Sequence, residues 1–131
     1  MRRRWDLKDA SGATALEFSL VAPIFITLLV GLFQLAWTLH CAATVRWSLE
    51  TSSRGLMLDP NESAATLKAN MVDLLAGRAT ANNLTVTITP DTSNPQGKML
   101  VASSVYTATL AIPLLPSQSL TFHASTSVPA L

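Results

Sequence analysis

The sequence predicts an α+β fold: a transmembrane helix near the N-terminus that extends outward, a second helix, and a small antiparallel three-stranded sheet. Three observations predict it. Residues 18–45 contain no Asp, Glu, Lys or Arg. Apolar residues then recur at helical spacing as far as residue 75. From residue 84 the chain becomes rich in Thr, Ser and Val, with runs that alternate between apolar and polar residues.

The most apolar segment, residues 18–39, is long enough to cross a bilayer, since about 20 residues rising about 1.5 Å each span its hydrocarbon core. Only 13% of the chain is charged, whereas about a quarter of a soluble domain is. A buried core helix is the alternative, but the rest of the chain is too short to surround such a helix on all sides. We therefore assign residues 13–40 to a transmembrane helix.

The distribution of basic residues predicts the orientation of this helix. Four of them precede the span: Arg2, Arg3, Arg4 and Lys8. Only Arg46 and Arg54 follow it within about 20 positions, so the positive-inside rule places the N-terminus in the cytoplasm. Residues 1–12 then form a basic cytoplasmic leader, and residues 41–131 form an extracytoplasmic α+β domain. Trp37 and Trp47 flank the outer end of the span, as aromatic residues do at a membrane interface.

The N-terminal end of the apolar run carries an unusual acidic residue. Glu17 stands directly before it, where an unpaired carboxylate costs a few kcal/mol if it enters hydrocarbon. A basic leader ends at Gly12, five residues earlier, and Phe18 follows the acid. In this arrangement the sequence resembles type IV pilin-like precursors, which a membrane aspartyl protease, the prepilin peptidase, cuts after the glycine. The resemblance implies that Ala13 becomes the new N-terminus and that Glu17 becomes its fifth residue.

This spacing has a physical logic. Cleavage creates an α-amino group with a pKa near 8, which is mostly charged at neutral pH. When helices pack side by side with an axial stagger, the Glu17 carboxylate of one subunit can meet the Ala13 ammonium of the next. Each charge is costly alone in a lipid-like environment, and leaving one partner unpaired is costly too. The pair therefore sets the register between subunits.

A longer pattern narrows the resemblance. It reads Gly12-Ala13-x-Ala15-x-Glu17-Phe18-x-Leu20-Val21-x-Pro23, with Gly31 in the apolar stretch that follows. Over about residues 8 to 45 the sequence resembles the N-terminal segment of TadE-like proteins, which are pseudopilins of the Tad system that assembles Flp pili. Pro23 permits a helix kink, and Gly31 permits close helix approach. Where family members often carry an acidic residue, this chain has Gln34 and Ala36, and Gln34 can hydrogen-bond a neighbouring helix.

The resemblance implies a pilin-like fold and a minor pilin or pseudopilin of a Tad (Flp, type IVc) pilus and secretion system in the bacterial inner membrane. Its partners would be the membrane, the prepilin peptidase, other pilin-like subunits (the major Flp pilin and sister pseudopilins) and the inner-membrane assembly platform. The alternative is an uncleaved single-span anchor whose outer domain binds a partner. The net charge of +1 gives no case for a nucleic-acid partner.

Cleaved export signals compete with these interpretations. The apolar stretch of a secretory signal is usually about 7–15 residues long, and this one is longer. Arg3 and Arg4 are similar to a twin-arginine signal, but Asp6 takes a position that prefers an apolar residue. A lipoprotein signal needs a small residue before its cysteine, whereas His40 precedes Cys41.

Beyond the span, the helical pattern continues to about Gly55, with Arg46–Glu50 and Glu50–Arg54 as i,i+4 pairs. We expect a second helix to begin at Asp59 as N-cap and to end at Gly77. The predicted strands and turns follow in order: a strand over 84–89, a turn-rich loop over 90–97, a strand over 99–112, a turn over 113–117 and a strand over 120–125.

The sequence predicts no enzyme, no cofactor and no metal site. His40 and His123 are far apart in the sequence, the first in the predicted membrane-boundary helix and the second in a predicted strand. No cluster of His, Cys, Asp or Glu residues has metal-ligand spacing. No phosphate-binding glycine-rich loop and no nucleophile elbow is present. Cys41 is the single cysteine. We expect it to be a buried small apolar residue, and an intermolecular disulfide is the alternative.

Overall fold

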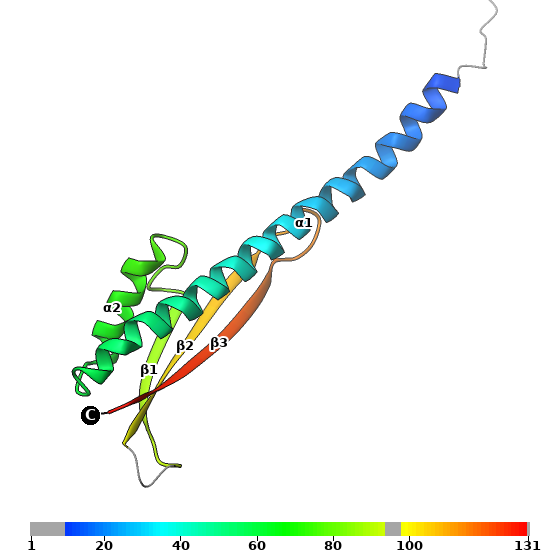
Figure 1. The fold of residues 1–131 in the computed structure, drawn as a ribbon. Helices are drawn as coiled ribbons and strands as arrows, with labels where there is room; N and C mark the ends of the chain where they lie inside the picture. Colours follow the sequence, from blue (N-terminus) through cyan, green and yellow to red (C-terminus); the bar gives the residue numbers. More distant parts are fainter. Residues whose placement is uncertain (1–9, 94–97, 131) are drawn as a thin grey trace, which may run out of the picture.

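The computed structural model describes residues 10–93 and 98–130, so the basic residues predicted for the leader, Arg2, Arg3, Arg4 and Lys8, lie outside the described residues. The elements are α1 (Ala10–Ser52), the 3₁₀ helix η1 (Ser53–Met57), α2 (Ala64–Leu75), β1 (Leu84–Asp91), β2 (Met99–Leu110) and β3 (Gln118–Pro129). The predicted α+β fold is confirmed. Figure 1 shows one long helix whose C-terminal half packs on a three-stranded sheet, while its N-terminal half projects away from the rest of the chain.

The environment of α1 changes along its length. This helix has 43 residues, about 65 Å at 1.5 Å per residue. From Leu16 to Leu39 nearly all of its large apolar side chains are exposed. From Thr38 onward one face is buried, in the order Thr38, Cys41, Val45, Ser48, Leu49. Steps of three and four residues keep these side chains on one helix face. The helix crosses position 40 without interruption, so the proposed division between residues 13–40 and 41–131 falls inside a single element.

The sheet is an antiparallel meander in the order β1-β2-β3. Leu84 pairs with Tyr106 at one end of β1–β2, and Leu110 pairs with Gln118 beside the β2–β3 connection. β1 runs past its predicted end to include Pro90. β1 is an edge strand, where a residue without an N–H is tolerated. β3 likewise continues to Pro129 on the other edge.

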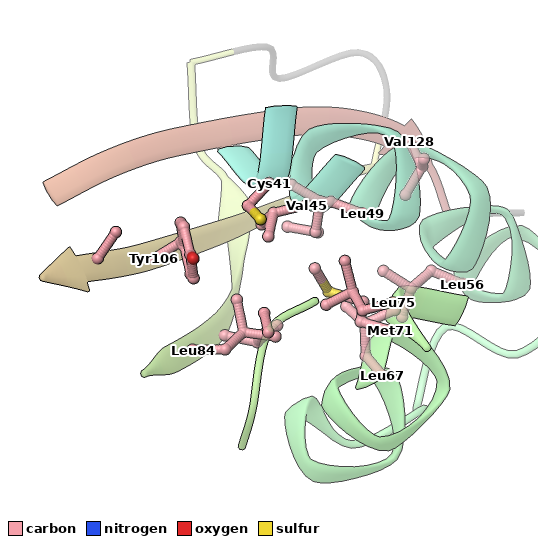
Figure 2. Close-up of a cluster of buried hydrophobic side chains, with 14 residues drawn as sticks. Cys41, Val45, Leu49, Leu56, Leu67, Met71, Leu75, Leu84, Tyr106 and Val128 are labelled. Carbon is pink, nitrogen blue, oxygen red and sulfur yellow. The ribbon is translucent and has the colours of Figure 1, made fainter. Parts of the chain in front are cut away.

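The core lies where α1, α2 and one face of the sheet meet. Its fully buried members include Leu49 of α1, Met71 of α2 and Leu84 of β1, and Figure 2 shows their side chains converging. Alternate residues of β2, among them Ala102 and Tyr106, face this core. The small domain therefore buries the second half of α1 and leaves the first half uncovered.

The prediction that α2 begins at Asp59 is wrong. The N-cap is Ser63, whose hydroxyl accepts the Thr66 N–H at 3.1 Å, and α2 begins at Ala64. The Asp59 carboxylate instead accepts the Asn61 N–H at 3.0 Å in a local turn. Such short-range side-chain bonds compete with helix formation. The predicted end is confirmed, since the helix stops at Leu75 and two left-handed residues, Ala76 and Gly77, follow.

The two predicted i,i+4 ion pairs have different outcomes. Arg46 Nε lies 3.0 Å from Glu50 Oε1 on the exposed face of α1. The predicted pair between Glu50 and Arg54 is wrong, because no such contact exists among the described residues. α1 ends at Ser52, and Arg54 falls in η1, where the helical i,i+4 geometry is lost.

Candidate functional site

The exposed apolar half of α1 is the first functional feature of the molecule. It is the one helix in the described part of the chain that is long and apolar enough to cross a membrane. None of its most apolar 18-residue window is buried by the protein. A helix that is apolar all round requires an apolar environment, because leaving large apolar surface in water is unfavourable.

The residues predicted for cleavage and register lie on the first turns of α1. Gly12, Ala13, Glu17 and Phe18 are all exposed, Phe18 by 72%. A Cβ added at Gly12 would meet nothing within 4 Å. Within the described residues, no hydrogen bond or ion pair to the Glu17 carboxylate is present. All four residues thus lie on the outer surface of the helix, and their predicted roles remain predictions.

α1 runs through Pro23 without a break, and nearby hydroxyls supply local hydrogen bonds. The Thr27 hydroxyl donates to the Pro23 carbonyl at 2.7 Å. Ser19 donates to the Leu16 carbonyl, also at 2.7 Å. Hydroxyl side chains that bond back to their own helix bring few unsatisfied polar groups into hydrocarbon. Ser19 and Thr27 are therefore compatible with a membrane.

Gly31 lies under the connection between β2 and β3. A Cβ built on it would be 3.5 Å from Ile112 Cδ1, which is ordinary van der Waals contact. The predicted close approach at Gly31 is thus made within the chain by a loop, and the space suffices for alanine. Figure 1 shows this connection reaching the middle part of α1.

Gln34 forms a two-point contact with the same connection. Its Nε2 donates to the Ala111 carbonyl at 2.7 Å, and its Oε1 accepts the Ala111 N–H at 3.0 Å. The side-chain amide thereby pairs with the backbone of the residue that follows β2, as a neighbouring strand would. We expected Gln34 to bond a neighbouring helix, but in this structure both ends of its amide bind Ala111.

A stripe of residues along α1 joins these contacts, and it was not predicted from the sequence. Gly31, Gln34, Thr38, Cys41 and Val45 follow one another in steps of three and four, and all five face the sheet or its connection. Four of the five are small or polar, whereas the residues between them up to position 39 are mainly large and apolar. That contrast is the signal from which the packing face could have been found.

The comparison with known proteins adds an independent observation on this helix. Residues 12–54 match the family model described as TadE-like protein. This segment is TadE-like. The match begins at Gly12 and continues through α1 into η1, so it confirms the predicted resemblance and extends beyond residue 45, where we expected it to end. No curated protein and no solved structure matches the chain.

The TadE-like segment also contributes Cys41 to the core. Its thiol is free and its residue is only 1% exposed, which confirms the prediction of a buried cysteine. Burial raises the pKa of the Tyr106 phenol, and the electrostatic interaction and hydrogen bond with Cys41 raise it further. The Tyr106 ring stacks on Phe122 of β3 with 6.2 Å between ring centroids. These contacts tie α1 to the central and edge strands.

Other ionisable groups are dispersed over the outer domain. Among residues 10–93 and 98–130, no group of three or more His, Cys, Asp or Glu side chains could hold a metal ion. The Ser93 hydroxyl and N–H both donate to Asp91, and these bonds lower the pKa of that exposed carboxyl. The features that stand out are thus the apolar half of the TadE-like segment and the loop that contacts it.

Proposed function

We propose that the chain is a minor pilin or pseudopilin of a Tad (Flp, type IVc) pilus assembly and secretion system. In this proposal a prepilin peptidase cuts after Gly12, and the mature chain spans the bacterial inner membrane once. Its N-terminus faces the cytoplasm and its sheet faces the periplasm. The observation that carries the proposal is the TadE-like segment itself: an exposed apolar helix with Gly12 and Glu17 at one end and a folded domain at the other.

The position of Gly12 supports cleavage. It lies in the first turn of α1, where backbone N–H groups lack helical partners. Glycine also weakens a helix by about 0.5–1 kcal/mol relative to alanine. Terminal turns open at little cost, so a peptidase can bind this stretch in an extended form.

The surroundings of Glu17 support a contact with another subunit. The carboxylate stands on an exposed apolar helix and has no partner among the described residues. An ionised group there is costly in hydrocarbon, and pairing with a cation is the usual remedy. The ammonium group at Ala13 of a neighbouring, processed subunit supplies such a cation.

The test of cleavage is N-terminal sequencing and intact-mass analysis of the protein from its native membrane, beside Gly12→Ala. The added methyl group meets nothing within 4 Å, so this variant leaves the fold intact. Gly31→Ala is the matched control, because it makes the same change in the same helix with room for the methyl group. We expect wild type and control to begin at Ala13, and Gly12→Ala to stay uncut.

If the wild-type protein retains residues 1–12, the alternative is supported: an uncleaved anchor whose outer domain binds a partner in pilus or envelope assembly. A cut near Cys41 would contradict both proposals and indicate an exported domain.

The test of register is recovery of the protein in sheared pilus fractions after Glu17→Gln. We expect normal cleavage and strongly reduced recovery, since the variant keeps the shape of the side chain and removes its charge. Glu50→Gln is the control, because it removes a carboxylate from the same helix outside the apolar segment, where the ion pair with Arg46 contributes little. Equal recovery of the two variants would contradict the register role.

A further inference from the structure

The loop between β2 and β3 has an unusually apolar composition. Residues 111–117 read Ala-Ile-Pro-Leu-Leu-Pro-Ser. Leu114 is 84% exposed and Leu115 is 58% exposed. From residue 99 to residue 130 the chain contains no Asp, Glu, Lys or Arg, so the entire β2–β3 hairpin carries no permanent charge. Surface loops of water-soluble domains are usually polar, because their exposed groups must interact with water.

The backbone holds one of these leucines in an uncommon conformation. Leu114 has φ +68°, in the left-handed region that a large side chain rarely adopts. Such a conformation costs free energy and persists where the surroundings require it, often at functional sites. Here a strained residue displays a large apolar side chain that the protein itself does not cover.

The loop lies against the apolar half of α1. Ile112 contacts Gly31, and an open apolar hollow of about 350 Å³ is lined by Ile24 and Leu28 of the helix and by Leu114 and Leu115 of the loop. Gly31 precedes Trp37 by six residues, which corresponds to about 9 Å along the helix axis. Because an aromatic residue such as Trp37 is expected at the interface, the loop lies on the membrane side of that interface, near the boundary between the headgroups and the hydrocarbon region.

Part of the polar backbone of the connection has partners within the chain. The Ala111 N–H and carbonyl are both bonded by Gln34, and the Leu115 N–H donates to the Ile112 carbonyl at 3.2 Å. Pro113 and Pro116 bring no N–H groups at all. The N–H groups of Ile112 and Leu114 have no partner among the described residues. Lipid tails offer none either, so the loop backbone fits the interfacial region, where water and headgroups can bind these groups, and not the hydrocarbon core.

We propose that the β2–β3 loop, residues 111–117, dips into the interfacial region of the leaflet nearest the sheet, so that Leu114 and Leu115 insert into lipid while the loop backbone stays near the headgroups, and that it forms a second lipid contact beside α1. Its occupant is lipid, because the exposed leucines continue the surface of a helix whose own apolar side chains are uncovered. The contact would fix the depth and tilt of the outer domain relative to the membrane. The proposal depends only on α1 spanning the bilayer, and it holds for a cleaved or an uncleaved chain.

The test is the accessibility of a nitroxide label at Leu114→Cys. The full chain carries Cys41→Ala as well and is reconstituted in vesicles of phosphatidylcholine and phosphatidylglycerol. Collisions with oxygen, which concentrates in lipid, are compared with collisions with a water-soluble nickel chelate. Labels at Phe25→Cys, on the exposed apolar helix outside the hollow, and at Thr87→Cys on β1 provide the lipid and water references.

We expect the label at position 114 to show an oxygen-to-nickel ratio several-fold above that of Thr87→Cys and between the values of Thr87→Cys and Phe25→Cys. A ratio equal to that of Thr87→Cys would overturn the proposal, because the loop would be in water. Protection from both reagents would overturn it as well, since a second protein copy would then cover the loop.

A second measurement separates immersion from misfolding. In this measurement the nitroxide label is attached at Leu115→Cys. Its oxygen-to-nickel ratio is measured in a chain that also carries Leu114→Asp and in a chain that carries Ser117→Asp, an exposed polar position in the same loop. We expect the first aspartate to lower the oxygen-to-nickel ratio at position 115 several-fold and the second to lower it less. Equal ratios in both variants, with unchanged circular dichroism, would contradict lipid immersion.

Discussion

The pairing of Gln34 with Ala111 is the contact that holds the β2–β3 hairpin on α1 at its membrane-proximal end, and its removal gives the sharpest test of the structure. Gln34→Leu keeps the approximate volume and removes both the donor to the Ala111 carbonyl and the acceptor of its N–H. The net contribution of one such hydrogen bond is about 0.5–1.5 kcal/mol. The two together stabilise this contact by about 1–3 kcal/mol.

That range corresponds to an increase of about 5- to 150-fold in the population of the locally opened hairpin end, since about 1.4 kcal/mol equals tenfold. The assay is amide hydrogen exchange of the full chain in lipid nanodiscs, followed at Ala111. We expect protection of that amide to fall by this factor, because its N–H loses its acceptor. Amides in the middle of β2, such as that of Ser104, should change much less.

The matched control is Thr44→Val, which removes a side-chain hydrogen bond inside the same helix. The Thr44 hydroxyl donates to the His40 carbonyl at 2.9 Å and makes no bond to the sheet. Unchanged protection of Ala111 in Gln34→Leu, or an equal loss in Thr44→Val, would refute the role assigned to the amide.

Three further predictions concern the outer domain. Met71→Ala should lower the free energy of unfolding by about 2–5 kcal/mol, because Met71 is fully buried, whereas the partly exposed Leu74→Ala should cost clearly less; equal midpoints in denaturant would contradict the assigned core. Ser63→Ala should destabilise α2 by about 0.5–2 kcal/mol through loss of the N-cap bond, and unchanged hydrogen exchange in α2 would exclude that cap. Burial and Cys41 raise the folded pKa of Tyr106 above the ordinary value of 10.0. The stability that the neutral phenol contributes is therefore fully present below that value and is lost as the pH rises through the folded pKa. Tyr106→Phe should weaken this alkaline loss of stability in thermal unfolding, and an identical pH dependence of the two proteins would refute the assignment.

Much of the fold followed from local patterns. The uninterrupted apolar run predicted the exposed helix, and the change from helical spacing to alternation predicted where the sheet begins. Strand bounds were less accurate at Pro90 and Pro129, because proline is tolerated on the edge strands that this three-stranded sheet provides. The N-cap of α2 was misplaced because Asp59 and Ser63 both suit a helix start, and only the local turn at Asp59 distinguishes them.

The candidate site, like the fold, could be predicted from the sequence only in part. Gly12, Glu17 and Pro23 were recognised from their spacing in a short segment, and the TadE-like match to residues 12–54 supports that recognition. The partner of Gln34 could not be predicted, because Ala111 is 77 positions away along the chain and a lone amide in an apolar run has many conceivable partners.

The sequence by itself determined that this protein has one long apolar helix, a helix–sheet domain after it, and a glycine and a glutamate at the start of the apolar run. These features depend on composition and on spacing between near neighbours, which the backbone periods of 3.6 and 2 convert directly into structure. Only the tertiary structure decided that the β2–β3 loop lies beside Gly31 and that Gln34 binds the backbone of Ala111. Those contacts join residues distant in sequence, and the packing of the sheet along α1 brings them together.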